Sequence, residues 1–115
     1  MNRIAIPIEK GKLSELFGKS SHYEIFEIDE WLIRKNYIEA PSLKDITELP
    51  EWFAKEGITD VITFKIAKQI INLFAKHKVN LFIGIKTNTS QEIIKDYING
   101  RLFSDDSIIS EITKE

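Results

Sequence analysis

The residues best suited to bind a ligand lie in two short polar segments, residues 14–22 and residues 63–65. They provide hydroxyl groups, backbone amides and lysine ammonium groups, which are the donors that a small anion needs. Open α/β sheets bind ligands outside the carboxyl ends of their parallel strands, and both segments are expected to follow such strands. The candidate binding residues are Ser14, Phe17, Gly18, Lys19, Ser21, His22, Thr63, Phe64 and Lys65, with Phe64 restricting the crevice between the two segments. The alternative is a plain turn with solvated lysines.

His22 is the candidate metal ligand, because a neutral imidazole can coordinate a metal ion or the edge of a cluster. A single histidine is a poor metal site on its own. The chain contains no cysteine, so it offers no thiolate to zinc, copper or an iron-sulfur cluster, and it forms no disulfide. The sequence therefore predicts no metal-ligand set and leaves the identity of a cofactor open.

The sequence lacks the residue patterns that hydrolytic enzymes use. A two-metal nuclease needs several carboxylates that converge on the strand ends. Residues 4–8 contain none, and Glu9 and Asp60 are single acids expected at opposite ends of their strands. No serine has an evident histidine and aspartate arrangement beside it. We therefore expect that the protein is not an enzyme.

The apolar pattern predicts five strands and about three helices that position these residues. A charged turn at residues 9–12 follows the first strand, and a short polar turn at Asp29 and Glu30 lets the second and third strands pair as a hairpin. Thr89 with Glu92 three residues later is a capping-box pattern. Residues 79–85 are nearly all apolar, as in a strand covered on both faces. The expected strands are 3–8, 23–29, 31–38, 60–64 and 79–85; the expected helices are 47–56, a segment from 66 onward, and the segment after Thr89 that ends at Asn99 and Gly100.

This order of elements predicts a mixed α/β sheet. An antiparallel meander comes first and βαβ units follow it. Because βαβ crossovers are right-handed, the strands at 3–8, 60–64 and 79–85 should run parallel, and the other two should lie beyond strand 3–8.

Composition and charge narrow the class of protein. The 115 residues suit one domain, and 43% hydrophobic and 30% charged residues are ordinary for a globular chain. The net charge of −2 gives no general attraction to nucleic acid or to an anionic membrane. The chain has neither a signal-peptide pattern nor a run of about 18 apolar residues. We expect a cytoplasmic protein without nucleic-acid or membrane partners; a small anion or cofactor, a protein partner or a homo-oligomer remain open.

Several short motifs resemble those of the dinitrogenase iron-molybdenum cofactor biosynthesis family. The Ser-x-x-Phe-Gly-Lys loop at residues 14–19 is similar to its Ser-x-x-Phe-Gly-Arg/Lys loop, and residues 4–7 are similar to its opening Ile-Ala-Ile-Pro strand. Further likenesses occur at residues 49–52, 60–63, 81–84, 89–92 and 99–102. The resemblance implies a ribonuclease-H-like fold and, in some relatives, the carriage of metal-sulfur cofactors or their precursors.

Three departures from the family pattern weaken cofactor binding. Many relatives have a pattern similar to Ser-x-His-Phe-Gly, and this chain has Leu16 at the position of the histidine. The histidine side chain that could bind a cofactor is therefore absent. Many relatives place Gly-Gly where Phe64 and Lys65 put side chains into the space beside the backbone. No cysteine is present to replace these features.

We therefore expect residues 1–103 to form a domain of this family, with residues 104–115 as a tail. Ser104 to Ser107 could cap a short helix with a narrow apolar stripe of Ile108, Ile109 and Ile112. The leading hypothesis is a non-enzymatic domain that binds or carries a small ligand or metallocofactor, with ligation of a cluster lost. The alternative is a structural or protein-interaction module of the same fold without a ligand.

Overall fold

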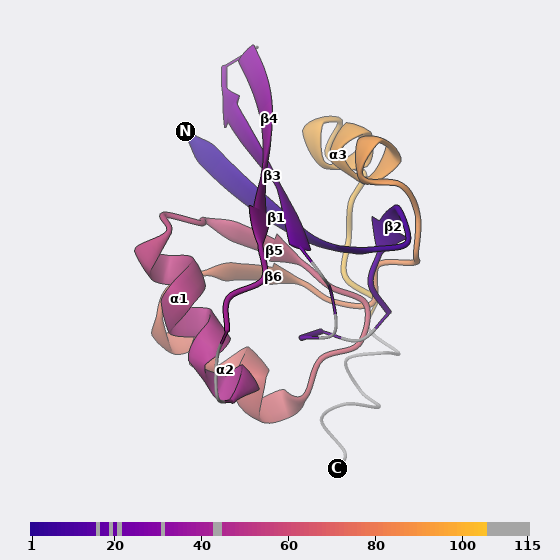
Figure 1. Ribbon diagram of the computed structural model, residues 1–115. Coiled ribbons are helices and arrows are strands. Elements are labelled where there is room, and N and C mark those ends of the chain that lie inside the picture. Colours follow the sequence, from indigo (N-terminus) through magenta and orange to yellow (C-terminus); the bar gives the residue numbers. More distant parts are fainter. Residues whose placement is uncertain (16, 19, 21, 31, 43–44, 106–115) are drawn as a thin grey trace.

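The computed structural model describes residues 1–105 apart from residues 16, 19, 21, 31 and 43–44. Within these ranges the chain forms a mixed α/β sheet with three α-helices (Figure 1). The elements in chain order are β1 (Asn2–Glu9), β2 (Lys12–Leu13), β3 (His22–Asp29), β4 (Leu32–Glu39), the 3-10 helix η1 (Ile46–Glu48), α1 (Leu49–Lys55), β5 (Asp60–Ile62), α2 (Lys68–Lys76), β6 (Asn80–Phe82) and α3 (Ser90–Ile98).

The amino-terminal half is an antiparallel meander. Strand β1 pairs antiparallel with β3, and β3 pairs antiparallel with β4 along all eight residues of both strands. The predicted hairpin is therefore confirmed, with Asp29 opposite Leu32.

The short strand β2 pairs with β1 across Lys10 and Gly11, which both have positive φ. Two residues of positive φ are typical of the tight turn that joins two strands directly. This turn lies in the expected charged segment, but the strand after it was not predicted.

The carboxyl-terminal half adds the parallel strands. The strand order of the sheet is β4-β3-β1-β5-β6, and the short strand β2 lies outside this order and pairs with β1 alone among the described strands. Strands β1, β5 and β6 run parallel, and β3 and β4 lie beyond β1, as the sequence predicts. Strand β6 is shorter than the expected 79–85 and lies at the edge. Leu81 packs toward one side of the sheet and Phe82 toward the other, but both are only half-buried.

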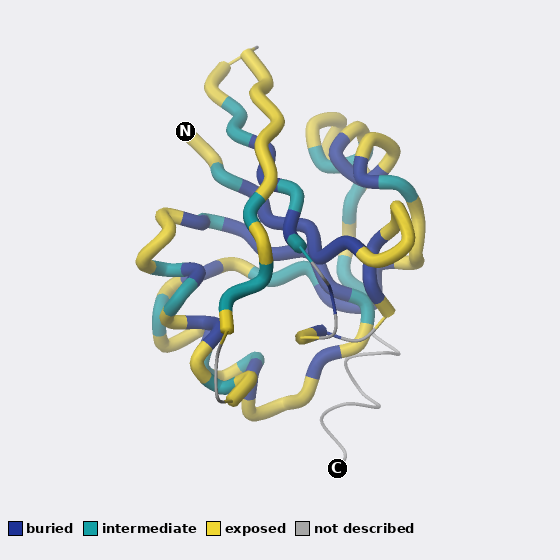
Figure 2. The backbone as a smooth tube through the Cα atoms, in the orientation of Figure 1, coloured by how far each residue is buried: buried dark blue, intermediate teal, exposed yellow. Residues whose placement is uncertain are grey.

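Successive side chains of β1 point to opposite faces of the sheet, so one strand contributes to two apolar layers. Ala5 joins Tyr23 and Val61 in the layer beneath α1 and α2. Ile4, Ile6 and Ile8 join the layer beneath α3, which contributes Ile93 and Ile94. Figure 2 shows the buried strands lying between these helices. The sheet is thus covered on both faces, as in the predicted α/β architecture.

An aromatic cluster fills the layer beneath α1 and α2. Phe53 is fully buried, and its ring centroid lies 4.9 Å from that of Tyr23 and 5.9 Å from that of Phe74. Phe17, from the loop before β3, completes the cluster at 5.5 Å from Phe74. Phe53 on α1 and Phe74 on α2 therefore hold the loop that carries Phe17 against the core.

The helix boundaries follow their capping residues. The Thr89 side chain accepts a hydrogen bond from the backbone N–H of Glu92, and Asn99 ends α3, as predicted. The first predicted helix is shorter than expected, because η1 precedes it. Asp45 and Glu48 form the capping box of η1, a signal that the sequence analysis missed.

The start of the tail is fixed to the end of β6. The backbone N–H of Ile83 donates to the Ser104 hydroxyl at 3.0 Å, and the N–H of Asp105 donates to the Ile83 carbonyl at 2.9 Å. The predicted short helix with Ile108, Ile109 and Ile112 lies outside the described residues. No helix of the described part is long and apolar enough to cross a membrane.

Candidate functional site

The segments that follow the three parallel strands meet at the carboxyl edge of the sheet. The backbone N–H of Leu13 donates to the Asn88 carbonyl at 3.0 Å, which joins the β1–β2 hairpin to the segment after β6. The N–H of Ile85 donates to the Thr63 carbonyl at 3.1 Å, which joins that segment to the one after β5. Three parts of the chain that are distant in sequence therefore form one continuous edge.

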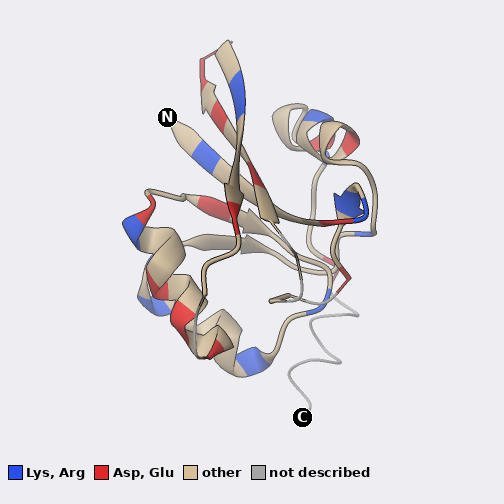
Figure 3. Ribbon diagram, in the orientation of Figure 1, with Lys and Arg blue, Asp and Glu red and all other residues tan. Residues whose placement is uncertain are grey.

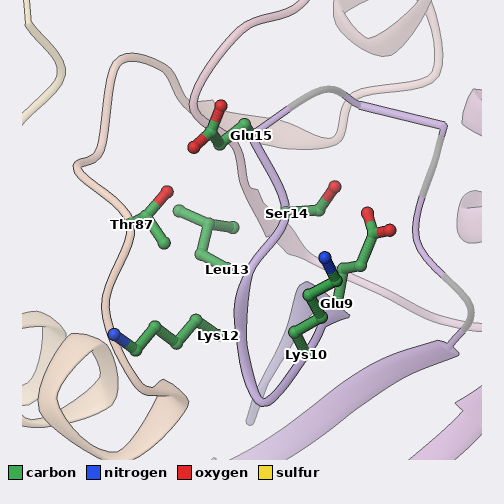
Figure 4. Close-up of a pocket in the computed structure, with 7 residues that line it drawn as sticks. All are labelled: Glu9, Lys10, Lys12, Leu13, Ser14, Glu15 and Thr87. Atoms are coloured by element: carbon green, nitrogen blue, oxygen red, sulfur yellow. The ribbon is translucent and has the colours of Figure 1, made fainter.

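A pocket of about 420 Å³ opens at this edge beside the β1–β2 hairpin (Figure 4). Among its lining residues, Leu13 and Ser14 are buried and the others are exposed. Figure 4 shows Lys12, Glu15 and Thr87 on one side of the hairpin backbone and Glu9 and Lys10 on the other. The lining residues are Glu9, Lys10, Lys12, Leu13, Ser14, Glu15 and Thr87.

The pocket combines positive charge, hydroxyl groups and two carboxylates. Lys10 and Lys12 supply ammonium groups, and Ser14 and Thr87 supply hydroxyls. Glu9 and Glu15 limit the net charge, so the pocket does not attract anions over a long range. A set of this kind suits a small anion that also carries a hydrogen-bond donor.

The expected crevice between residues 14–22 and 63–65 is bridged. The backbone N–H of Lys65 donates to the Glu15 carbonyl at 3.2 Å, and the Lys65 carbonyl accepts from Phe17 N–H at 3.1 Å. The two segments are thus in direct backbone contact, and the pocket in Figure 4 lies beside the hairpin instead, against Thr87. Ser14 is the predicted residue that lines this pocket.

Three of the predicted site residues serve packing. Phe17 is 7% exposed within the aromatic cluster, and Thr63 is 1% exposed and donates its hydroxyl to the Phe82 carbonyl. Gly18 has a φ of +92°, and a Cβ added there would overlap the Ile46 side chain of η1. The Phe-Gly part of the motif therefore has a structural reason: the chain must turn closely past η1.

The remaining predicted residues lie elsewhere. The Phe64 ring packs half-buried in the layer beneath α3, and the Lys65 ammonium lies 5.6 Å from its centroid. His22 begins β3, and its ring meets Tyr37 edge-on at 5.5 Å. Lys19 and Ser21 lie outside the described residues. The structure thus divides the seven predicted residues that it describes among the hairpin pocket, the two core layers and the β3–β4 surface.

Sequence reasoning missed Glu9, Lys10, Lys12, Glu15 and Thr87 as residues around one pocket. The sequence does contain features that could have located some of these residues. Lys-Gly between two apolar strands is compatible with a two-residue hairpin loop, which brings Lys12 back beside Glu9. Thr87 follows the third parallel strand, so the rule that located the other segments applies to it as well.

Burial raises the pKa of Tyr23, and the neighbouring hydroxyl of Ser20 acts in the opposite direction. Tyr97, on α3, also has a raised pKa because of burial and the negative charge of Asp60. Asp60 is 6% exposed, and its carboxylate accepts a 2.6 Å hydrogen bond from Thr59. This polar group lies at the amino end of β5, away from the hairpin pocket.

Comparison with known proteins gives a family and a fold. The family model described as dinitrogenase iron-molybdenum cofactor matches residues 1–100. The crystal structure of PH0822 is similar with a TM-score of 0.80 and 25% identity, covering 90% of this chain and 94% of that one. None of the curated proteins searched matches the chain.

Two further structures support the same fold. The apo form of the orange protein from Desulfovibrio gigas has a TM-score of 0.76 and 15% identity, with 91% of this chain and 93% of that one covered. The protein mj0327 from Methanocaldococcus jannaschii has a TM-score of 0.70 and 20% identity, with 89% and 93% covered. The mixed sheet and its helices are therefore shared with these proteins.

Proposed function

Because the chain belongs to the dinitrogenase iron-molybdenum cofactor family, we propose that it is a non-enzymatic binding domain that holds a small anion in the hairpin pocket. The observation that carries the proposal is the pocket at the carboxyl edge of the parallel strands, where open α/β sheets bind their ligands. Lys12 would neutralise the anion, and the hydroxyl of Thr87, on the same side of the hairpin, would orient it (Figure 4).

The donor set does not fit a metal-sulfur cluster. The sequence contains no cysteine, so no thiolate is available to the iron atoms. Within the described ranges, no group of three or more His, Cys, Asp or Glu side chains could hold a metal ion. We therefore propose that this chain has kept the fold of its family and has lost the ligation of a cluster.

We propose that the pocket binds its anion reversibly and catalyses no reaction. Glu9, Lys10, Lys12 and Glu15 are all exposed, so water reaches each ionisable group of the lining. Catalytic acids and bases are usually placed where water is excluded and their pKa values are displaced. An open, hydrated lining is better suited to reversible binding than to proton transfer.

Anion binding by the full chain tests this proposal. Inorganic phosphate, sulfate and a small dicarboxylate are titrated separately by calorimetry. At least one should bind, and Lys12→Ala should weaken it about tenfold, which corresponds to about 1.4 kcal/mol. Lys76→Ala on α2 removes the same charge from an exposed position away from the pocket and is the control. Equal affinity in the two variants, or no binding of any of the three anions, would contradict the proposal.

The loss of cluster ligation has its own test. Protein purified without oxygen should be colourless and contain no stoichiometric iron or molybdenum. The opposite result is bound metal with visible absorption that disappears in His22→Ala. That result would show that His22 ligates a cluster despite the missing thiolates.

A further inference from the structure

Strand β4 is a free edge of the sheet. In the sheet order it lies at one end, and among the described strands it pairs with β3 alone. Figure 2 shows the β3–β4 hairpin projecting beyond the rest of the chain, with β4 exposed along most of its length. The outer backbone N–H and C=O groups of such a strand are a template for pairing with another strand.

The exposed side chains of β4 include large apolar groups. Leu32 is 53% exposed, Ile33 is 47% exposed and Tyr37 is 62% exposed. Natural edge strands are usually short or covered, because a long apolar edge promotes association. Strand β4 has eight residues and is exposed along most of its length, so it is an edge that is open to association.

The charges of β4 select one pairing with a second copy. In a two-fold antiparallel pair, facing residues point to the same side of the sheet. A pair centred on Lys35 places this lysine against itself, and a pair centred on Asn36 places Lys35 opposite Tyr37. A pair centred on Tyr37 places Lys35 opposite Glu39 of the second copy, twice. Of the pairings centred on residues 33–38, this one alone matches opposite charges.

We propose that two copies of this chain associate through β4, antiparallel about a two-fold axis at Tyr37, so that their sheets join into one. Figure 3 shows both signs of charge on the projecting hairpin, as a self-complementary edge requires. The same surface patch serves both copies, which is the usual arrangement of a two-fold dimer. This association does not depend on the hairpin pocket or its ligand.

A hollow of about 770 Å³ adjoins the centre of this edge. It is lined by His22, Glu24, Lys35, Asn36 and Tyr37, so three of its residues belong to β4. The Tyr37 ring leans edge-on against His22, and the Lys35 ammonium lies 3.4 Å from Glu24. In the dimer, Tyr37 of the second copy lies opposite Tyr37 and covers the open side of the hollow.

Lys35 can serve both its own chain and the second copy. Its side chain is 46% exposed, so the ammonium retains room to approach a carboxylate beyond the edge. Glu24 also accepts a hydrogen bond from the Ser90 hydroxyl. The carboxylate of Glu24 therefore keeps a partner when Lys35 turns toward Glu39 of the second copy.

Charge reversal tests the pairing by sedimentation velocity at protein concentrations from about 10 μM to about 1 mM. The unmodified chain should shift from monomer to dimer over this range. Lys35→Glu and Glu39→Lys should each weaken the dimer about tenfold or more, because both attractive pairs become repulsive. Lys76→Glu makes the same charge change on α2 and should leave the dimer unchanged.

Mixing the two variants gives the decisive result. One chain then carries two acids at positions 35 and 39 and the other carries two lysines, so an equal mixture should recover a heterodimer. The thermal melt of each variant checks that it is folded. A monomer at every concentration, a dimer that both single variants retain, or a mixture without a heterodimer would each overturn the proposal.

Discussion

Replacing Gly18 with alanine should destabilise the fold through two separate effects. The φ of +92° lies in the left-handed region, where a non-glycine residue costs about 1 kcal/mol. The added Cβ would also overlap Ile46 Cδ1 and lie 3.0 Å from Ile46 Cγ1. The Ile46 side chain is 37% exposed and its Cδ1 is a flexible end, so it can shift at less than the cost of overpacking a closed core, and Gly18→Ala should lower the free energy of unfolding by about 1–2 kcal/mol.

Gly11 supplies a matched control for the backbone effect. Its φ is +79°, and an added Cβ would meet nothing within 4 Å. Gly11→Ala should therefore cost only the backbone term of about 1 kcal/mol. Urea unfolding followed by circular dichroism gives both free energies from the midpoint and the slope.

A double variant separates the two effects at Gly18. Ile46 is 37% exposed, so Ile46→Ala removes the overlapping atoms at a small cost of its own. In the Ile46→Ala background, Gly18→Ala should cost no more than Gly11→Ala. If Gly18→Ala and Gly11→Ala cost the same in the unmodified chain, close packing against η1 is not the reason for glycine in this loop.

Three further predictions concern the core, the tail and alkaline pH. Phe53→Ala should cost about 3–5 kcal/mol in urea unfolding, because a fully buried ring at the centre of the aromatic cluster is removed; a cost below about 1 kcal/mol would contradict that packing. Ser104→Ala should cost about 1–3 kcal/mol, because the Ile83 N–H loses its acceptor, and an unchanged urea midpoint would show that this bond does not stabilise the domain. Since burial holds the pKa of Tyr23 above 10.0 in the folded chain, the free energy of unfolding should be constant just below that pH and fall as the pH rises through the folded-state value. Tyr23→Phe should reduce this alkaline fall, measured by urea unfolding at several pH values; an equal fall in the variant would assign it to other groups.

The strand order was predictable because the apolar pattern is unambiguous over the long strands. The alternation of Ile4, Ile6 and Ile8 indicates a strand, and right-handed crossovers leave few positions for β5 and β6. Short elements were less accessible. Strand β2 has two residues, which is too few for a period of two to be recognised, and its place depends on the turn at Lys10 and Gly11.

The sequence places its candidate residues at the carboxyl edge of the sheet, where the hairpin pocket opens with a partly different set of lining residues. Topology alone places the loop after β1 and the turn after β5 at one edge. The sequence does not reveal that Lys65 bonds to the backbone of residues 15 and 17, because backbone hydrogen bonds between loops leave no side-chain pattern. Phe17 was read as a binding residue, whereas its position is explained by Phe53 and Phe74, which are distant in the sequence.

Amide chemical-shift mapping is the most direct test of the proposed binding site. Isotope-labelled protein is titrated with the anion that binds most strongly in calorimetry, and the backbone amide signals are followed. The account predicts that the largest shifts occur at Lys12, Ser14 and Thr87, and that they shrink in Lys12→Ala. Shifts concentrated at His22 and Tyr37, or no saturable shifts at all, would contradict a binding site in the hairpin pocket.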